Sequence, residues 1–195
     1  MLRAIVLAAG ASRRLGEPKA LADLGGRSAL ERLLDVLTAV DRRPLVVVGA
    51  HANEICARVN ASCEWVHNEA WAEGRTTSLA AALLHAPDRD ALVAPVDVPL
   101  VTAETVAGLV RAWREAGEPE CGWLAPRLGP TGRYGHPVLI GRKLLARLDP
   151  RKDLRTLRAE ARPLLEWISS DPAILDDLDT PQDLARLRER LALES

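Results

Sequence analysis

The chain has 195 residues, of which 48% are hydrophobic and 27% are charged, and its formal net charge is −1. These values are ordinary for a soluble globular protein with one large core, and they predict a single domain over residues 1–195. A nearly neutral chain has no general attraction to nucleic acid or to an anionic membrane. The scarcity of aromatic side chains also argues against a surface that stacks single-stranded bases.

Cysteine usage and the N-terminus bear on the compartment. Cys56, Cys63 and Cys121 are odd in number and form no C-x-x-C pair, which favours reduced thiols in a cytoplasm over a disulfide framework. The apolar run after Arg3 is shorter than the roughly 7–15 residues of a signal-peptide core, and no other segment is long enough to span a bilayer. We therefore expect a cytoplasmic protein without a membrane partner.

The first predicted element is a buried strand that starts at Ala4 and breaks at Gly10 into a loop of small residues. That loop carries Ser12, Arg13 and Arg14 and ends at Lys19. Backbone N–H groups that converge with arginine and lysine side chains form a suitable site for a polyphosphate. The alternative is an ordinary strand-to-loop turn with solvated charges. Two arginines and a lysine in one loop directly after a strand favour the phosphate interpretation.

A helix and a second strand follow. Ser28 and Glu31 have the spacing of a capping box, and leucines at positions 30, 33, 34 and 37 predict a helix with one buried face. Residues 44–48 form a continuous apolar run closed by Gly49. Such a run is typical of a strand covered on both faces in a largely parallel sheet, so the order of elements predicts a βαβ unit.

The next segment contains a short helix over 53–59, a strand over 64–67 and a polar loop over 68–78. Thr76, Thr77 and Ser78 at the end of this loop predict N-capping of an apolar helix over 79–85. The alternative is that the helix start presents its N–H groups and hydroxyls to a ligand. Spacing alone favours capping.

The strand over 91–97 delivers a carboxylate, Asp97, at its C-terminal end, and Pro99 follows soon after. In open α/β sheets, ligands bind beyond the carboxyl ends of the strands, so Asp97 and Lys19 are expected at the same edge. A carboxylate beside a phosphate site repels the ligand unless a cation lies between them, and Mg²⁺ suits one or two carboxylates plus substrate phosphates. The alternative role for Asp97 is to cap the next turn.

Thr102 is expected to cap a helix that runs through Trp113, followed by a strand over 122–125 and a glycine-rich turn over 129–137. His136 in that turn is predicted to be an exposed imidazole, for which a binding role and no role at all are equally supported. The basic segment over 142–162 predicts two helical pieces broken at Pro150. Most of its charges are expected to be solvated, with one or two reaching an anionic substrate.

After a strand over 164–168 comes an acidic segment that contains Asp177, Asp179 and Asp183. Asp179 or Thr180 can cap a final helix with Pro181 in its first turn, and Asp183 fits a structural role at the positive end of the helix dipole. Asp177 and Asp179 alternate just before the cap. Either of them is therefore a candidate for a second carboxylate on the metal.

These motifs together resemble the nucleotidyltransferase family that contains the molybdenum cofactor cytidylyltransferases and the molybdopterin guanylyltransferases. The resemblance covers nearly the whole chain. Residues 7–21 (LAAGASRRLGEPKAL) match the phosphate-binding signature of that family. Further matches are the nucleotide-side loop with Asn68, Trp71, Gly74 and Ser78, the segments 97–99 (DVP) and 135–137 (GHP), and the acidic segment 177–181.

The resemblance implies one nucleotidyltransferase domain over 1–195, a three-layer α/β/α sandwich of the nucleotide-diphospho-sugar transferase type. Its Rossmann-like sheet would be mixed and mostly parallel. The implied reaction is Mg²⁺-dependent transfer of a nucleoside monophosphate from a nucleoside triphosphate to a small phosphorylated acceptor such as molybdopterin, with release of pyrophosphate. Ala9 favours CTP, because the guanylyl branch tends to carry a second glycine at that position. A transient contact with a molybdoenzyme or its chaperone is also implied.

The resemblance also implies roles for individual residues. Arg14, Lys19 and Asp97 would be catalytic, and Asp97 with Asp177 or Asp179 would hold the metal. His136 and Pro137 would bind the acceptor. The residues implied on the nucleotide side are Leu7, Ala8, Ala9, Gly10, Ser12, Arg13, Lys19, Asn68, Gly74 and Ser78. Rival hypotheses are the use of GTP, a sugar or polyol phosphate as acceptor, and a non-catalytic nucleotide-binding module.

Overall fold

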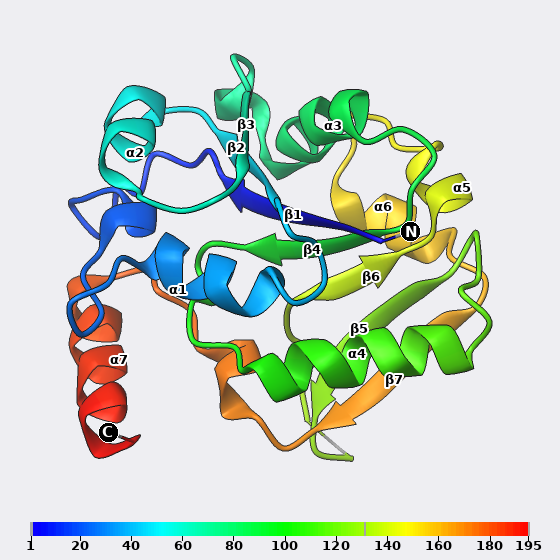
Figure 1. Cartoon of the computed structure of the whole chain (residues 1–195). Coiled ribbons are helices and arrows are strands. Elements are labelled where there is room, and N and C mark those ends of the chain that lie inside the picture. Colours follow the sequence, from blue (N-terminus) through cyan, green and yellow to red (C-terminus); the bar gives the residue numbers. More distant parts are fainter. Residues whose placement is uncertain (1, 131, 195) are drawn as a thin grey trace.

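The computed structural model describes residues 2–130 and 132–194 (Figure 1). Its strands are β1 (Arg3–Ala8), β2 (Leu45–Val48), β3 (Glu64–His67), β4 (Ala91–Pro95), β5 (Trp123–Leu128), β6 (Val138–Ile140) and β7 (Leu164–Ser169). Its α-helices are α1 (Ala29–Leu37), α2 (Ala52–Arg58), α3 (Arg75–His85), α4 (Ala103–Glu115), α5 (Arg142–Leu145), α6 (Leu154–Ala159) and α7 (Pro181–Glu194). Short 3₁₀ helices are η1 (Lys19–Leu21), η2 (Trp71–Glu73) and η3 (Pro172–Leu175).

The strands of the described residues join in one seven-stranded sheet in the order β3-β2-β1-β4-β6-β5-β7. Strand β1 pairs in parallel with both β2 and β4, β2 pairs in parallel with β3, and β5 pairs in parallel with β7. Only β6, among these strands, runs antiparallel to its neighbours β4 and β5. The predicted mixed, mostly parallel sheet is confirmed.

Helices cover both faces of the sheet, as the three-layer expectation requires (Figure 1). One apolar cluster joins the sheet to α1 and α4 through residues such as Leu33, Leu109 and Trp113. A second cluster on the opposite face joins it to α3, α5 and α6 through Leu79 and Leu157, among others. Burial of these apolar side chains is the main favourable contribution to the fold.

Helix α1 begins as its sequence predicts. Ser28 Oγ accepts a hydrogen bond from the N–H of Glu31 at 3.2 Å, and Glu31 Oε2 accepts one from the N–H of Ser28 at 2.9 Å. The reciprocal pair satisfies two N–H groups that the helix itself leaves without partners. The capping box predicted at this position is therefore confirmed.

The C-terminal helix α7 lies beside the segment that follows the first loop (Figure 1). A third apolar cluster joins them: Leu15 and Leu24 from the early segment pack with Leu184 and Leu187 of α7. At the start of α7, Thr180 and Asp183 form a second reciprocal cap, with N–H to side-chain oxygen distances of 2.9 and 3.2 Å. The predicted cap and the structural role of Asp183 are both confirmed.

The strand order reverses beside β1, because β2 and β3 lie on one side of it whereas β4 returns to the other side. In doubly wound sheets, the crevice at the carboxyl ends of the strands at such a reversal is where ligands bind. The loop after β1 and the segment after β4 both leave the sheet at this crevice. The topology thus places the glycine loop and Asp97 at the same end of the sheet.

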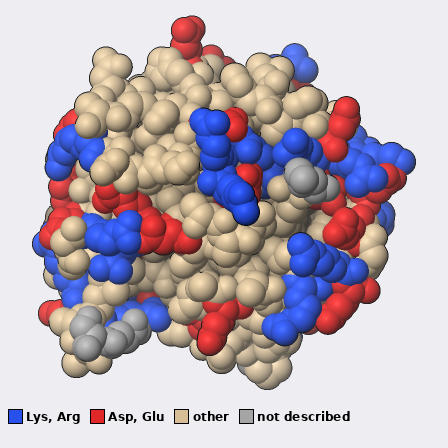
Figure 2. Space-filling model, viewed as in Figure 1, with Lys and Arg blue, Asp and Glu red and all other residues tan. Residues whose placement is uncertain are grey.

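The face of the molecule in Figure 2 carries interspersed basic and acidic side chains, in keeping with the nearly neutral net charge. Across residues 2–130 and 132–194, no helix combines the length and the apolar character needed to cross a membrane.

Candidate active site

The loop after β1 folds back on itself through Ser12, whose φ of +50° lies in the left-handed region. The carbonyl oxygen of Ser12 accepts hydrogen bonds from the N–H groups of Leu15 and Gly16, at 3.1 and 3.2 Å. Its hydroxyl oxygen accepts a third from the N–H of Lys19 at 3.0 Å. Ser12 therefore closes the loop and fixes the place from which the Lys19 side chain projects.

A second tether for the loop comes from the segment after β2. His51 Nε2 lies 3.1 Å from the carbonyl oxygen of Ala11, and the N–H of Ala50 donates to the carbonyl oxygen of Ala9 at 3.1 Å. This role of His51 was not predicted from the sequence. The available signal was its position directly after a strand that neighbours β1 in a parallel sheet.

The loop borders a hollow of about 300 Å³. Residues expected at the nucleotide or catalytic site that line it are Leu7, Ala8, Ala9, Gly10, Ser12, Arg13, Arg14, Lys19, Gly74, Ser78, Asp97 and Asp179. Trp71 of the expected nucleotide-side loop lines it too, and so do Ile55, Arg75 and Val96, which were not predicted to do so. The structure thus gathers nearly all of the expected nucleotide-side residues around one space.

Asn68 is the expected nucleotide-side residue that does not line this hollow. Its side chain is buried, and Nδ2 donates to the hydroxyl oxygens of Thr77 and Ser78, both at 3.0 Å. Oδ1 accepts from the N–H of Ala70 at 3.0 Å. Asn68 therefore ties the loop over 68–74 to the first turn of α3.

The predicted start of that helix is wrong. Helix α3 begins at Arg75, its N-cap is Gly74, and no side chain caps it. Thr76, Thr77 and Ser78 lie buried inside the first turn, where the Thr77 hydroxyl contacts the carbonyl oxygens of Gly74 and Ala70 at 2.8 and 3.0 Å. Gly74 adopts φ +129°, a conformation that L side chains rarely adopt, and this lets the helix start four residues earlier than its apolar stripe indicates.

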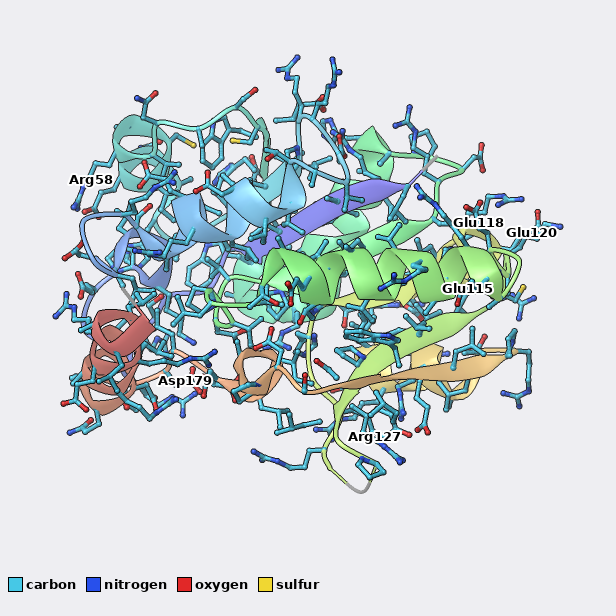
Figure 3. All side chains as sticks on the ribbon, turned by 60° about the horizontal axis from the view of Figure 1, so that its bottom comes forward. Arg58, Glu115, Glu118, Glu120, Arg127 and Asp179 are labelled. Atoms are coloured by element: carbon cyan, nitrogen blue, oxygen red, sulfur yellow. The ribbon has the colours of Figure 1, made fainter. Side chains whose placement is uncertain are left out.

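Two acidic segments far apart in the chain meet above the loop. The N–H of Leu178 donates to the carbonyl oxygen of Asp97 at 2.7 Å, which draws the segment before α7 to the end of β4. Lys19 Nζ forms a hydrogen bond and ion pair with Asp179 and lies 3.9 Å from Asp97 Oδ2. Arg14 donates to Asp179 at 2.7 Å. Figure 3 shows Asp179 between η3 and α7, at the opposite end of the sheet from Glu115, Glu118 and Glu120.

These contacts set the charge of Asp179. Partial burial alone would raise the pKa of its carboxyl, but the hydrogen bond from Lys19 and the charges of Lys19 and Arg14 lower the pKa below its ordinary value. Asp179 is therefore fully ionised at neutral pH, and the cations predicted to hold phosphate are paired with carboxylates in the ligand-free protein.

A second hollow of about 470 Å³ adjoins the first. Its lining includes Arg133, Tyr134, His136 and Asp177, which do not border the first hollow. Pro137 is buried and does not line the second hollow. None of the basic residues over 142–162 lines either hollow, so the expectation that one or two of them reach the substrate is not supported by the described residues.

His136 is half-buried, and the prediction of an exposed imidazole is wrong. The backbone N–H of His136 donates to the carbonyl oxygen of Ile174 at 3.0 Å, and this hydrogen bond holds His136 against η3. Burial lowers the pKa of its imidazole; the charge of Asp97 raises it and that of Arg75 lowers it. Nδ1 is buried and has no hydrogen-bond partner among the described residues. His136 therefore presents a neutral imidazole in the second hollow.

The pKa of Asp177 is shifted upward, in contrast to that of His136. Partial burial and the negative charges of Asp97 and Asp179 raise the pKa of its carboxyl, while the charges of Lys19 and Arg75 act against the shift. A raised pKa means that the folded protein binds this proton more tightly than the unfolded chain does, so ionisation of Asp177 destabilises the ligand-free fold. This contribution is absent well below the ordinary pKa of aspartate and develops as pH rises through the folded-state pKa.

Replacement of Asp177 with Asn is therefore expected to raise the thermal unfolding temperature at pH 7 and to give no gain at acidic pH. The neighbouring Asp176→Asn variant is a matched control of opposite sign, because Asp176 accepts hydrogen bonds from Arg186 and Arg190 at 2.6 and 2.5 Å. Calorimetric unfolding at both pH values tests this. A lower unfolding temperature for Asp177→Asn at pH 7 would contradict the charge crowding.

The carboxylates of Asp97, Asp177 and Asp179 suit a hard divalent cation, because Mg²⁺ prefers oxygen ligands. In the described part of the chain, no three His, Cys, Asp or Glu side chains group closely enough to hold a metal ion. Mg²⁺ does not require such a cage, because one or two carboxylates and the substrate phosphates usually bind it. Asp97, Asp177 and Asp179 fit that mode of binding.

The chain over residues 4–170 matches the family model described as a MobA-like NTP transferase domain. The chain belongs to this family. It is a nucleotidyltransferase, and the match covers both the loop after β1 and the segment after β4. The resemblance inferred from the motifs is thereby confirmed.

Individual relatives show how far the similarity extends. The nicotine blue oxidoreductase of Paenarthrobacter nicotinovorans is 30% identical over 94% of each chain. The molybdenum cofactor cytidylyltransferase of Escherichia coli is 25% identical over 95% of each. A nucleotidyl transferase from Methanothermobacter is 25% identical and superimposes with a TM-score of 0.81, covering 100% of this chain and 99% of that one.

Proposed function

We propose that this protein transfers CMP from CTP to a phosphorylated acceptor, most specifically molybdopterin, and releases pyrophosphate. The observation that carries the proposal is that the two hollows share a set of charged side chains. These side chains, which define the junction of the hollows, are Arg14, Lys19, Arg75, Asp97 and Asp179. If the nucleotide binds in the first hollow and the acceptor in the second, the α-phosphate that is attacked lies at this junction. The attacking acceptor oxygen forms a bond to the α-phosphorus as the bond to the departing pyrophosphate breaks.

The residues of this chain supply position and charge. Lys19 and Arg14 hold the triphosphate and the departing pyrophosphate by exchanging Asp179 for phosphate oxygens. The backbone over 8–10 faces the base and ribose. Because phosphoryl transfer needs little covalent help from the protein, orientation and neutralisation of charge account for the rate.

Members of the NTP transferase family commonly use divalent metals. In this chain Asp97, with Asp177 or Asp179, would hold Mg²⁺, which when bound supplies positive charge beside the reacting phosphates. The raised pKa of Asp177 supports this, because it shows that Asp97 and Asp179 are near enough for their negative charges to act on Asp177, and a bound divalent cation would relieve that repulsion.

The choice of substrates rests on two observations. Ala9, which lines the first hollow, favours CTP over GTP by resemblance to the cytidylyl branch. A relative that matches over nearly its whole length is named a molybdenum cofactor cytidylyltransferase, which supports molybdopterin as the acceptor. With that acceptor, transient contact with a molybdoenzyme or its chaperone follows as the route by which product leaves. Cys56, Cys63 and Cys121 are free thiols, which accords with the predicted cytoplasmic location.

A pyrophosphate-release assay with CTP, GTP, ATP and UTP tests the proposal, each with molybdopterin, a sugar phosphate or a polyol phosphate. We expect release with CTP and molybdopterin. Release of pyrophosphate with a sugar or polyol phosphate, and not with molybdopterin, would change the proposed acceptor and leave the proposed nucleotidyl transfer intact. Binding of a nucleotide without release in any combination would favour a non-catalytic module. Because one relative is named an oxidoreductase, NAD(P)H oxidation is followed in parallel, and no turnover is expected.

A further inference from the structure

Five side chains of the described residues line both hollows: Arg14, Lys19, Arg75, Asp97 and Asp179. Four of them were expected at the site from the sequence. Arg75 was not, and neither its role nor its ligand follows from the motifs. It is the first residue of α3, its side chain is 53% exposed, and the φ of +129° at Gly74 turns the chain toward the junction just before it.

The three cations at the junction differ in how firmly they are held. Arg14 and Lys19 are hydrogen-bonded to Asp179. Arg75 makes only a longer contact in the described structure, 3.5 Å from its Nη2 to Asp97 Oδ2. A guanidinium has five N–H donors in a planar fork, so most of the donors of Arg75 remain available to a ligand.

Arg75 borders the second hollow as well as the first. Its positive charge lowers the pKa of His136, and together with Lys19 it acts against the raised pKa of Asp177; neither His136 nor Asp177 lines the first hollow. The pKa of Asp179, in contrast, is lowered by Lys19 and Arg14. Arg14 and Lys19 are therefore held at Asp179, whereas Arg75 lies beside Asp97 and its charge acts on residues of the second hollow.

We propose that Arg75 binds the phosphate of the acceptor and orients it toward the nucleotide. This inference rests on the proposed function and extends it to a residue and a contact. The fork of an arginine matches two phosphate oxygens at once, which sets the direction of the attacking oxygen as well as its position. Arg75 adds a third positive charge to those of Arg14 and Lys19 beside the carboxylates that line the two hollows, which favours an anionic acceptor.

The test uses inorganic phosphate as the probe for the acceptor phosphate. Protein is first saturated with the non-cleavable α,β-methylene analogue of the nucleotide that binds best among the four, so that phosphate cannot enter the triphosphate position. Phosphate affinity is then measured by line broadening in ³¹P NMR, and affinity for the analogue by calorimetry. The variants are Arg75→Met, Arg75→Lys and the control Arg58→Met, whose arginine lies on α2 and pairs with Glu54 at 2.9 Å (Figure 3).

We expect Arg75→Met to weaken phosphate binding by about tenfold to a hundredfold, the usual effect of losing a charge-assisted contact, with less than about a threefold change for the nucleotide analogue. Arg75→Lys should fall between this variant and wild type, and Arg58→Met should match wild type. Methionine is a good helix former, so α3 should keep its start. Unfolding temperatures check this.

Two results would overturn the inference while leaving the proposed function intact. One is wild-type phosphate affinity in Arg75→Met. The other is an equal loss of phosphate and analogue affinity, which would place Arg75 on the nucleotide side. If wild-type protein binds none of the four analogues, the proposed function fails and the inference fails with it.

Discussion

Asp97→Asn is expected to slow pyrophosphate release by about a hundredfold or more at ordinary Mg²⁺ concentrations, a loss typical of removing a group that stabilises transition-state charge. Asn keeps the size of the side chain but removes the negative charge that would hold the metal between the two hollows. It also removes the partner that lies 3.9 Å from Lys19 Nζ and 3.5 Å from Arg75. The rate should therefore recover only in part when Mg²⁺ is raised.

The control for this variant is Asp35→Asn, since Asp35 is an exposed carboxylate that pairs with Arg27 away from both hollows. Its pyrophosphate release should equal that of wild type. Both proteins should bind CTP, because Arg14 and Lys19 are intact in each. An Asp97→Asn enzyme with the wild-type rate would exclude a role for this carboxylate in holding metal.

Lys19→Ala is expected to weaken the affinity for nucleoside triphosphate by about tenfold to a hundredfold, measured by titration calorimetry. The side chain of Lys19 is only 16% exposed, so a phosphate that it contacts is partly shielded from water, where a charge-assisted hydrogen bond is strong. Part of that gain is offset in wild type, because Lys19 must first exchange Asp179 for a phosphate oxygen. The measured loss is the difference between these two contacts.

Lys143→Ala serves as the matched control, because Lys143 is an exposed lysine that pairs with Glu120 and does not line either hollow. Its nucleotide affinity should not change. Unchanged affinity in Lys19→Ala as well would remove Lys19 from the phosphate site. It would also leave the burial of this lysine between two acidic segments without a ligand to explain it.

The parts of the fold that sequence predicts well are those set by local patterns. The apolar run that ends at Gly10, the capping box of Ser28 and Glu31, and the cap of Thr180 and Asp183 each depend on residues within a few positions of one another. Strand-end placement in a parallel sheet then put Asp97 and Lys19 at one edge, and the topology confirms it. Contacts between neighbouring residues and one general rule of sheet architecture were sufficient to predict these caps and the placement of Asp97 and Lys19.

The parts that were mispredicted depend on contacts between distant segments. Thr77 and Ser78 looked like capping residues, but Asn68, nine or ten residues earlier, donates a hydrogen bond to each hydroxyl oxygen. This buried network exists only once the loop has folded. His136 looked exposed because its glycine-rich turn is typical of a surface, whereas η3 packs over it. No local pattern contains the information that residues 172–175 lie there.

The candidate site shows the same division. Asp177 and Asp179 were equivalent in the sequence, but the hydrogen bond from Leu178 to Asp97 turns Asp179 toward Lys19, 160 residues away, and leaves Asp177 in the second hollow. Arg75 had no motif to identify it. Its place at the junction depends on the early start of α3, which in turn depends on the backbone of Gly74.

The central claim is that a nucleoside monophosphate passes across the junction to an acceptor, and labelled substrate tests it directly. Wild-type protein is incubated with CTP labelled at the α-phosphorus, Mg²⁺ and molybdopterin, and the labelled products and pyrophosphate are quantified. We predict label in the acceptor and pyrophosphate in equal amounts, with neither formed above background by Asp97→Asn. Label recovered only as free CMP or CDP, or no conversion of CTP while the nucleotide still binds, would contradict nucleotidyl transfer to this acceptor.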